Sequence, residues 1–157
     1  MIRERILSNL DAQHGGGVAV TCPSEWGVQA LMHGGAWRNF HKDFWKVQIA
    51  RMVARNVKED AAHTYALTMM TGGVSRSRAI DIIAARDLAH WAKAIDVIDV
   101  SELPETRRYR NAWRRSPNGG PVWVDDAARV AIDEARMWAA YTAHLRGSEE
   151  GSAAYGV

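Results

Sequence analysis

The feature that most constrains the fold is an apolar repeat near the C-terminus. Over residues 126–145, large apolar side chains recur every three or four residues, which is the spacing of one face of an α-helix. The face consists of Val130, Glu134, Met137, Trp138, Tyr141 and Leu145. An aspartate precedes the first turn as a cap, and Gly147 is the expected end. The pattern predicts a long C-terminal helix that packs on a core through Trp138, followed by a flexible tail over residues 148–157.

Shorter periodic segments, separated by glycine pairs, occupy the first half of the chain. Apolar spacing predicts helices over residues 2–12, 24–33, 44–57, 59–70 and 75–87, with a brief strand at 18–20. Ser24 and Ser75 begin two of these helices and are typical N-caps, while a Gly-Gly pair follows each of two helices as a typical end. Residues 1–88 are therefore predicted to form a helical region.

The second half of the chain has a mixed pattern. Ile95–Val100 combines β-branched residues with partial alternation, and Val122–Val124 reads as a second short strand that we expect to pair with it. An arginine-dense turn or short helix at 107–115 lies between them. The predicted fold class is α+β and mostly α. A helical N-terminal half is followed by a small two-stranded β-hairpin element and the long C-terminal helix, with residues 89–147 completing one compact body.

Composition excludes several classes of protein. The chain has 157 residues, is 47% hydrophobic and carries a formal net charge of +2, which is typical of a folded domain rather than a disordered chain. A single cysteine, Cys22, cannot form an intramolecular disulfide and favours a reducing compartment. No apolar run is long enough to span a bilayer, and the charged start Met1–Arg5 is unlike a signal peptide. We therefore expect no membrane partner and a cytoplasmic location.

The sequence contains no recognisable catalytic or metal-binding motif. No glycine cluster is followed by the Lys-Ser/Thr of a phosphate-binding loop, and there is no His-Glu-x-x-His pattern or cysteine pair. His41-x-Asp43 is a weak acid–base or metal pair for which a surface loop is the favoured interpretation. Cys22 has no local base and is explained as a small buried side chain. We expect no catalytic residue, metal or cofactor, and hence a protein that is not an enzyme.

Two basic segments indicate nucleic-acid binding as an alternative. Residues 59–87 have the layout of a helix-turn-helix whose second helix would present Arg76 and Arg78 to DNA, although an ordinary helical hairpin is the favoured interpretation. Residues 107–115 interleave arginines with two aromatics, as in proteins that bind single strands or RNA. These arginines are Arg107, Arg108, Arg110, Arg114 and Arg115. Carboxylates lie on both sides of the segment, so we favour pairing within the fold, with Trp113 in the core.

Tryptophan and arginine are over-represented in the chain. Seven tryptophans against two phenylalanines, and sixteen arginines among twenty basic residues, are typical of binding surfaces, although a GC-rich genome also favours arginine codons. Trp26, Trp37, Phe40 and Phe44 lie in a stretch without a single-face period, so we expect some of them to be exposed to a partner. These four residues are the predicted partner-binding site.

A series of short segments follows in a defined order between residues 74 and 136. The segments are Ile82–Asp87, the strand Ile95–Val100, Glu102-Leu103-Pro104, Arg107, Tyr109-Arg110-Asn111-Ala112-Trp113, Val122-Trp123-Val124-Asp125 and Ala128-Arg129. This order resembles the C-terminal pattern of small uncharacterised proteins encoded by tailed phages and prophages of Gram-negative bacteria. The resemblance implies phage origin, often near tail or structural genes, and no assigned catalytic residue.

Together these observations predict a non-enzymatic, phage-encoded accessory protein that acts by protein–protein contact. It would be a virion- or tail-associated component or an inhibitor of a host defence complex, with a phage or host protein as its partner. Its expected location is the host cytoplasm, with the virion as a second location, and homo-oligomerisation is left open. Nucleic-acid binding through residues 59–87 and 107–115 is the alternative.

Overall fold

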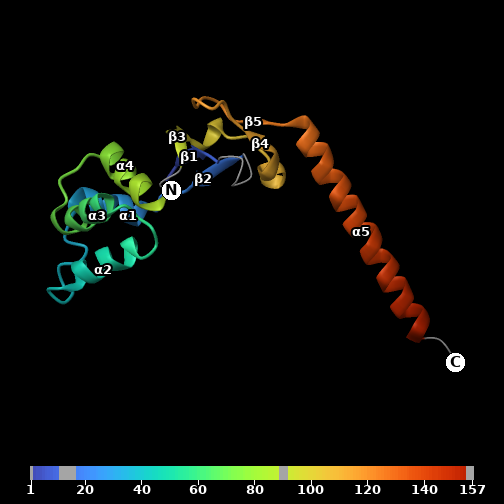
Figure 1. The fold of residues 1–157 in the computed structure, drawn as a ribbon, viewed down its shortest axis with the longest axis horizontal. Helices are drawn as coiled ribbons and strands as arrows, with labels where there is room; N and C mark the ends of the chain where they lie inside the picture. The colour runs from blue at the N-terminus through green and yellow to red at the C-terminus, as the bar shows by residue number, and fades with distance from the viewer. Residues whose placement is uncertain (1, 11–16, 89–91, 155–157) are drawn as a thin grey trace.

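The computed structural model describes residues 2–10, 17–88 and 92–154, with residues 147–154 described through their backbone alone. In chain order the elements are strands β1 (Glu4–Asn9) and β2 (Val18–Thr21), helices α1 (Glu25–His33), α2 (Phe44–Val53), α3 (Glu59–Thr71) and α4 (Arg76–Asp87), strand β3 (Lys93–Asp99), 3₁₀ turns η2 (Val100–Glu102) and η3 (Arg107–Ala112), strands β4 (Trp113–Arg114) and β5 (Trp123–Val124), and helix α5 (Asp126–Ala154). Figure 1 shows helices α1 to α4 at one end of the body, the strands beside them, and α5 extending away from both. The α+β class, with 54% helix, confirms the predicted mostly helical composition.

A three-stranded antiparallel sheet in the order β2-β1-β3 joins the two parts of the body. Ile6 on β1 pairs with Thr21 on β2 and with Val97 on β3, so β1 is the central strand. Ile6 and Leu7 are both fully buried, Ile6 in a cluster with the helices and Leu7 in a cluster with Trp113. Because consecutive strand residues point to opposite faces, β1 is covered on both faces.

The prediction of a helix over residues 2–12 is wrong, because residues 4–9 form a strand; residues 11 and 12 lie outside the described ranges. Ile2, Ile6, Leu7 and Leu10 have helix-like spacing, but a strand buried on both faces also lacks apolar–polar alternation. The brief strand predicted at 18–20 is confirmed as β2. The N-terminal half is therefore not wholly helical, since it supplies two strands of the sheet.

Helices α1, α3 and α4 pack against one another, and Ile6 of β1 belongs to the same buried cluster. Ser24 accepts a hydrogen bond from the backbone N–H of Gly27 at 3.1 Å, and Ser75 accepts one from that of Arg78 at 3.2 Å, which confirms both predicted N-caps. The buried cluster comprises Ile6, Val28, Leu31, Tyr65, Met69, Ala79, Ile80, Ile82, Ile83 and Ala84. Local capping and apolar periodicity therefore agree with the tertiary packing in this region.

Two glycines allow the backbones at the C-terminal ends of α1 and α3 to approach each other closely. Gly34 (φ 70°) and Gly72 (φ 68°) both adopt left-handed backbone conformations. A Cβ atom on Gly72 would lie 2.4 Å from the backbone nitrogen of Gly34, so a larger residue does not fit there. The close approach lets the N–H of Gly73 donate to the carbonyl of Met32 at 2.8 Å. The last turn of α1 is thus satisfied by the segment that follows α3.

Helix α2 is shorter than predicted, since it ends at Val53 rather than near residue 57. Asn56 has a φ of 64°, a left-handed conformation that cannot continue a helix and that asparagine tolerates better than most residues. Ile49 on α2 packs against Ala62 and Ala66 on α3 in a small separate cluster. The apolar spacing therefore predicted the helix but extended it through the turn at Asn56.

The other face of the sheet is covered by η3 and the β4–β5 hairpin. Trp113 is 1% exposed and packs with Leu7 and Val18, which confirms its predicted core position. Strand β5 pairs antiparallel with β4 and not with Lys93–Asp99, so that predicted pairing is wrong. The physical reason is that β3 pairs instead with β1, far away in the sequence.

Helix α5 leaves the body after its first turns. Its backbone passes Gly147, the expected end, and continues to Ala154, so it includes residues 148–154 of the predicted tail. Figure 1 shows α5 running outward from the region of η3 and β5. Trp138, which was predicted to lie in the core, is 66% exposed, so that prediction is wrong. The long helix itself is confirmed, but Val130, Met137, Trp138 and Tyr141 on its apolar face are exposed rather than packed on the core.

Candidate protein-contact surfaces

Three of the four predicted partner-binding residues form one aromatic cluster beside the helices. The rings of Trp37 and Phe44 meet edge to face, with 5.4 Å between their centroids. Phe40 is exposed and stacks on Phe44 at 4.2 Å. Both arrangements are favourable for aromatic pairs, so the cluster is held by its own contacts before any partner binds.

Trp26 lies on α1 and is not part of this cluster. It is 65% exposed and lines a cavity of about 530 Å³ together with Trp37, Tyr65 and Met69. The aromatic cluster lines a second cavity, of about 300 Å³. Trp37 is shared by both, so the predicted site consists of two adjoining hollows rather than one continuous surface.

A second apolar surface lies on α5, where the sequence analysis expected a core-facing stripe. Its members are Val130, Met137, Trp138, Tyr141 and Leu145, all of which are exposed, and we call them the α5 stripe. The rings of Trp138 and Tyr141 meet edge to face at 5.9 Å. The helical period placed these residues on one face of the helix, but periodicity does not say whether the same chain covers that face.

Polar contacts hold the start of α5 on the body. The N–H of Ala128 donates to the carboxylate of Asp125 at 3.0 Å, which caps the first turn. Asp133 accepts hydrogen bonds from Arg108 at 2.8 Å and from the hydroxyl of Tyr109 at 2.9 Å. These contacts fix the direction in which α5 leaves η3, so the α5 stripe is presented in a defined orientation.

Arg115 is the most deeply placed arginine of residues 107–115. Its guanidinium is buried, forms an ion pair with Asp96, and donates to the carbonyl oxygens of Ala94 at 2.7 Å and Gly120 at 2.8 Å. Burial lowers the pKa of the Arg115 guanidinium below its ordinary value. Arg115 therefore joins β3 to the hairpin turn and is not available to a nucleic acid.

The remaining arginines of this segment differ in their contacts. Arg114 lies 3.6 Å from the carboxylate of Asp125, and Arg108 forms the ion pair with Asp133 described above. Local carboxylates therefore pair with part of the cluster, as we expected. Arg107 and Arg110 are exposed and line a cavity of about 30 Å³ between β2 and η3.

Cys22 also lines this small cavity. Its side chain is exposed, so its explanation as a buried residue is wrong. It lies just beyond β2, on the sheet edge away from β3. The indole Nε1 of Trp113, another residue of the lining, is buried and has no hydrogen-bond partner among the residues that the structure describes.

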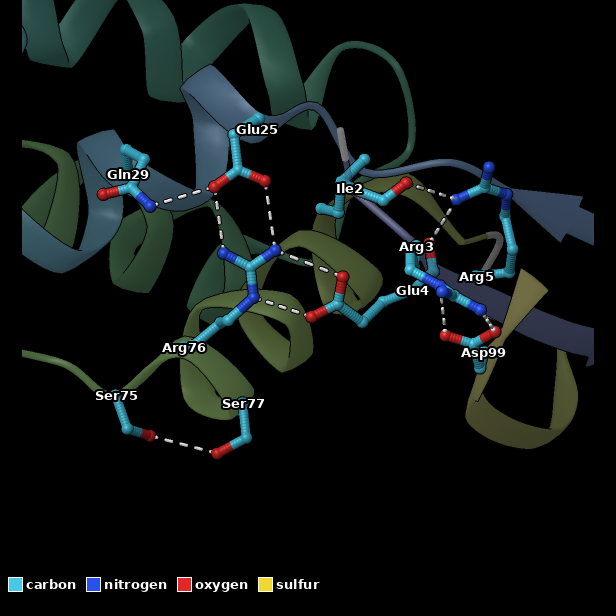
Figure 2. Close-up of polar contacts among 10 residues, drawn as sticks. All are labelled: Ile2, Arg3, Glu4, Arg5, Glu25, Gln29, Ser75, Arg76, Ser77 and Asp99. Atoms are coloured by element: carbon cyan, nitrogen blue, oxygen red, sulfur yellow. Dashed lines mark hydrogen bonds and ion pairs between the residues drawn. The ribbon is translucent and has the colours of Figure 1, made fainter. Parts of the chain in front are cut away.

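Arg76, a candidate DNA contact, is held inside the fold instead. Its Nε donates to Glu4 on β1 at 2.6 Å, and its Nη1 donates to Glu25 on α1 at 2.9 Å (Figure 2). These hydrogen bonds lower the pKa of each carboxyl to about 2. Arg76 is therefore paired within the fold, whereas Arg78, the other candidate DNA contact on α4, is exposed.

The weak candidate pair His41 and Asp43 lies on an exposed loop. Their side chains are 4.0 Å apart, and Asp43 also pairs with Lys46 at 3.1 Å. Within residues 2–10, 17–88 and 92–154 no group of three or more His, Cys, Asp or Glu side chains is arranged to hold a metal ion. The same residues contain no helix long and apolar enough to cross a membrane.

No family model matches the chain, and no curated protein or solved structure is significantly similar to it. The resemblance to phage proteins over residues 74–136 therefore stays a prediction.

Proposed function

We propose that this chain is a non-enzymatic accessory protein that acts by protein–protein contact, and that the α5 stripe is its principal contact surface. The single observation that carries the proposal is the exposure of Met137, Trp138 and Tyr141 on one face of a helix that extends from the body. A contiguous apolar face of this kind is unfavourable in water, and on a folded protein it marks an interaction site.

The composition of the α5 stripe supports a specific interface. Aromatic residues and methionine are enriched at protein interfaces, and tryptophan and tyrosine often contribute most of the binding energy. An amphipathic helix with anchors at helical spacing is also a recurrent form of recognition element. Because Asp133 anchors the base of α5, part of the ordering cost of binding is met before the partner arrives.

The resemblance of residues 74–136 supports the same class of protein from the sequence side. It favours a phage-encoded component, associated with the virion or tail or directed at a host defence complex. The nucleic-acid alternative has less support, because Arg76, Arg108 and Arg115 are engaged in contacts within the fold.

A capture experiment tests the proposal. The tagged protein is expressed in infected and uninfected cells, and its partners are compared with those of Trp138→Glu. The matched control is Ala139→Glu, which adds the same charge one residue further along α5, at an exposed position about 100° around the helix. We expect a specific phage or host protein, or a second copy of the chain, with the wild type and the control, and its loss with Trp138→Glu.

Two results would contradict the proposal. One is a purified protein that stays monomeric and captures nothing from either cell sample. The other is capture that is unaffected by Trp138→Glu but abolished by Trp26→Glu, which would move the contact surface to the cavities of the helical end.

A further inference from the structure

We propose that the partner of the α5 stripe is a second copy of this chain, and that the two α5 helices pair antiparallel about a two-fold axis close to Met137 and Trp138. This inference rests on the proposed function, since it names the partner of the same surface. Three features of α5 favour this pairing: the position of one carboxylate, the distribution of charge along the helix and the area of the α5 stripe.

Glu134 is a charged residue within the otherwise apolar face of α5. It lies within the apolar face, and its neighbours one turn away on the helix include Val130, Met137 and Trp138. No hydrogen bond or ion pair joins its side chain to another residue of the described ranges. When a partner covers this face, the carboxylate loses water and needs a donor from the partner.

Antiparallel self-pairing supplies that donor. With the two-fold axis between positions 137 and 138, Glu134 of each helix lies opposite Tyr141 of the other, and Met137 lies opposite Trp138. The phenol hydroxyl of Tyr141 then donates to the Glu134 carboxylate, and symmetry provides this contact twice. The same register places Val130 opposite Leu145, so the apolar ends of the stripe also meet.

Charge along α5 favours the antiparallel direction over the parallel one. Residues 126–135 contain three acidic side chains and one basic, a formal charge of −2, whereas residues 136–146 contain two arginines and no acid, a formal charge of +2. Antiparallel pairing sets the acidic half of one helix against the basic half of the other. Parallel pairing would set like charges together, which is unfavourable.

The area of the α5 stripe predicts a weak dimer. A large aromatic side chain carries about 150–250 Å² of surface, so five partly exposed side chains offer on the order of 500 Å² per copy. Two copies together would bury on the order of 1,000 Å², just below the roughly 1,200 Å² total at which standard specific interfaces begin and within the range of weak associations. The dimer should therefore dissociate on dilution. Helix α5 extends clear of the body beyond its anchored base, so a second helix has access to it (Figure 1).

Disulfide trapping tests the register. In a Cys22→Ser background, Met137→Cys should cross-link to itself because it lies next to the two-fold axis. Glu134→Cys and Tyr141→Cys should cross-link when mixed but not alone, since disulfides need Cα atoms within about 7 Å. Cross-linking of each single variant with itself, without a preference for the mixture, would show parallel pairing and overturn the proposal.

Light scattering across a concentration series provides the second measurement. We expect a mass that rises from 17.4 kDa towards twice that value. Trp138→Glu should weaken self-association by about tenfold or more and Tyr141→Phe by roughly tenfold, while Ala139→Glu leaves it unchanged.

A wild type that stays monomeric overturns self-pairing. If such a monomer still captures another protein in a Trp138-dependent way, the proposed function survives without the second copy. If capture is absent as well, both proposals fail.

Discussion

Trp113 and Trp138 show how differently the two parts of this molecule use the same kind of side chain. Trp113 is 1% exposed and packs against Leu7 and Val18 on the central sheet. Trp138 is 66% exposed on α5. Both residues were predicted to lie in the core, Trp113 within the arginine-dense segment 107–115 and Trp138 on an apolar helical face. The body buries Trp113, whereas α5 carries Trp138 away from the body.

The difference indicates that an apolar face predicts burial from water but does not identify the surface that buries it. Burial of a large aromatic side chain is favourable whether the covering surface belongs to the same chain or to another. Asp133 and Arg108 join the base of α5 to the body, while Met137, Trp138 and Tyr141 further along the helix are exposed, so this part of the apolar face can make intermolecular contact. The comparison therefore predicts that the body contributes fold stability and that α5 contributes association.

The largest expected effect comes from truncating the buried tryptophan. Trp113→Ala should lower the free energy of unfolding by about 3–5 kcal/mol, because it removes a core side chain and leaves a cavity. Trp138→Ala, measured in dilute monomer, should change it by no more than about 0.5 kcal/mol. Chemical denaturation of both variants checks the contrast, and equal losses of unfolding free energy would contradict the distinction between the body and α5.

A smaller loss of unfolding free energy is expected from a substitution where the C-terminal ends of α1 and α3 approach each other. Gly72→Ala should lower the free energy of unfolding by about 3 kcal/mol, near the top of the range for local strain, since its Cβ would lie 2.4 Å from the backbone of Gly34. Gly73→Ala is the matched control, because Gly73 also has a positive φ but nothing lies within 4 Å of its Cβ. Its expected cost is about 1–2 kcal/mol. Equal costs in thermal melts would show that the close approach does not matter.

The smallest predicted effect is a pH dependence carried by Arg76. The pKa values of Glu4 and Glu25 are lowered from 4.5 to about 2 because both carboxylates accept hydrogen bonds from its guanidinium. Their contribution to stability is therefore fully present above pH 4.5 and is lost as the pH falls towards 2. Arg76→Gln should be less stable than the wild type at neutral pH, with the difference shrinking across this window. A difference in melting temperature that stays constant from pH 5 to 2.5 would contradict the assignment.

Local rules predicted the helical elements well. Ser24 and Ser75 cap their helices as expected, because an N-cap depends on a side chain and a backbone N–H only three residues away. The boundary near Val53 was missed because the left-handed conformation of Asn56 is one of several that asparagine adopts. The sequence identified an aromatic stretch that contains Trp26, Trp37, Phe40 and Phe44. It did not show that these residues are divided between two cavities.

The sequence by itself determined the apolar faces, the caps and the long C-terminal helix, because these depend on contacts within a few residues. Only the tertiary structure decided that Glu4–Asn9 is a central strand, since that requires pairing with Lys93–Asp99, which is distant in the sequence. Only the tertiary structure decided that the α5 stripe is exposed. Periodicity shows which apolar side chains share a face of the helix. The direction in which α5 leaves η3 determines whether the rest of this chain covers that face.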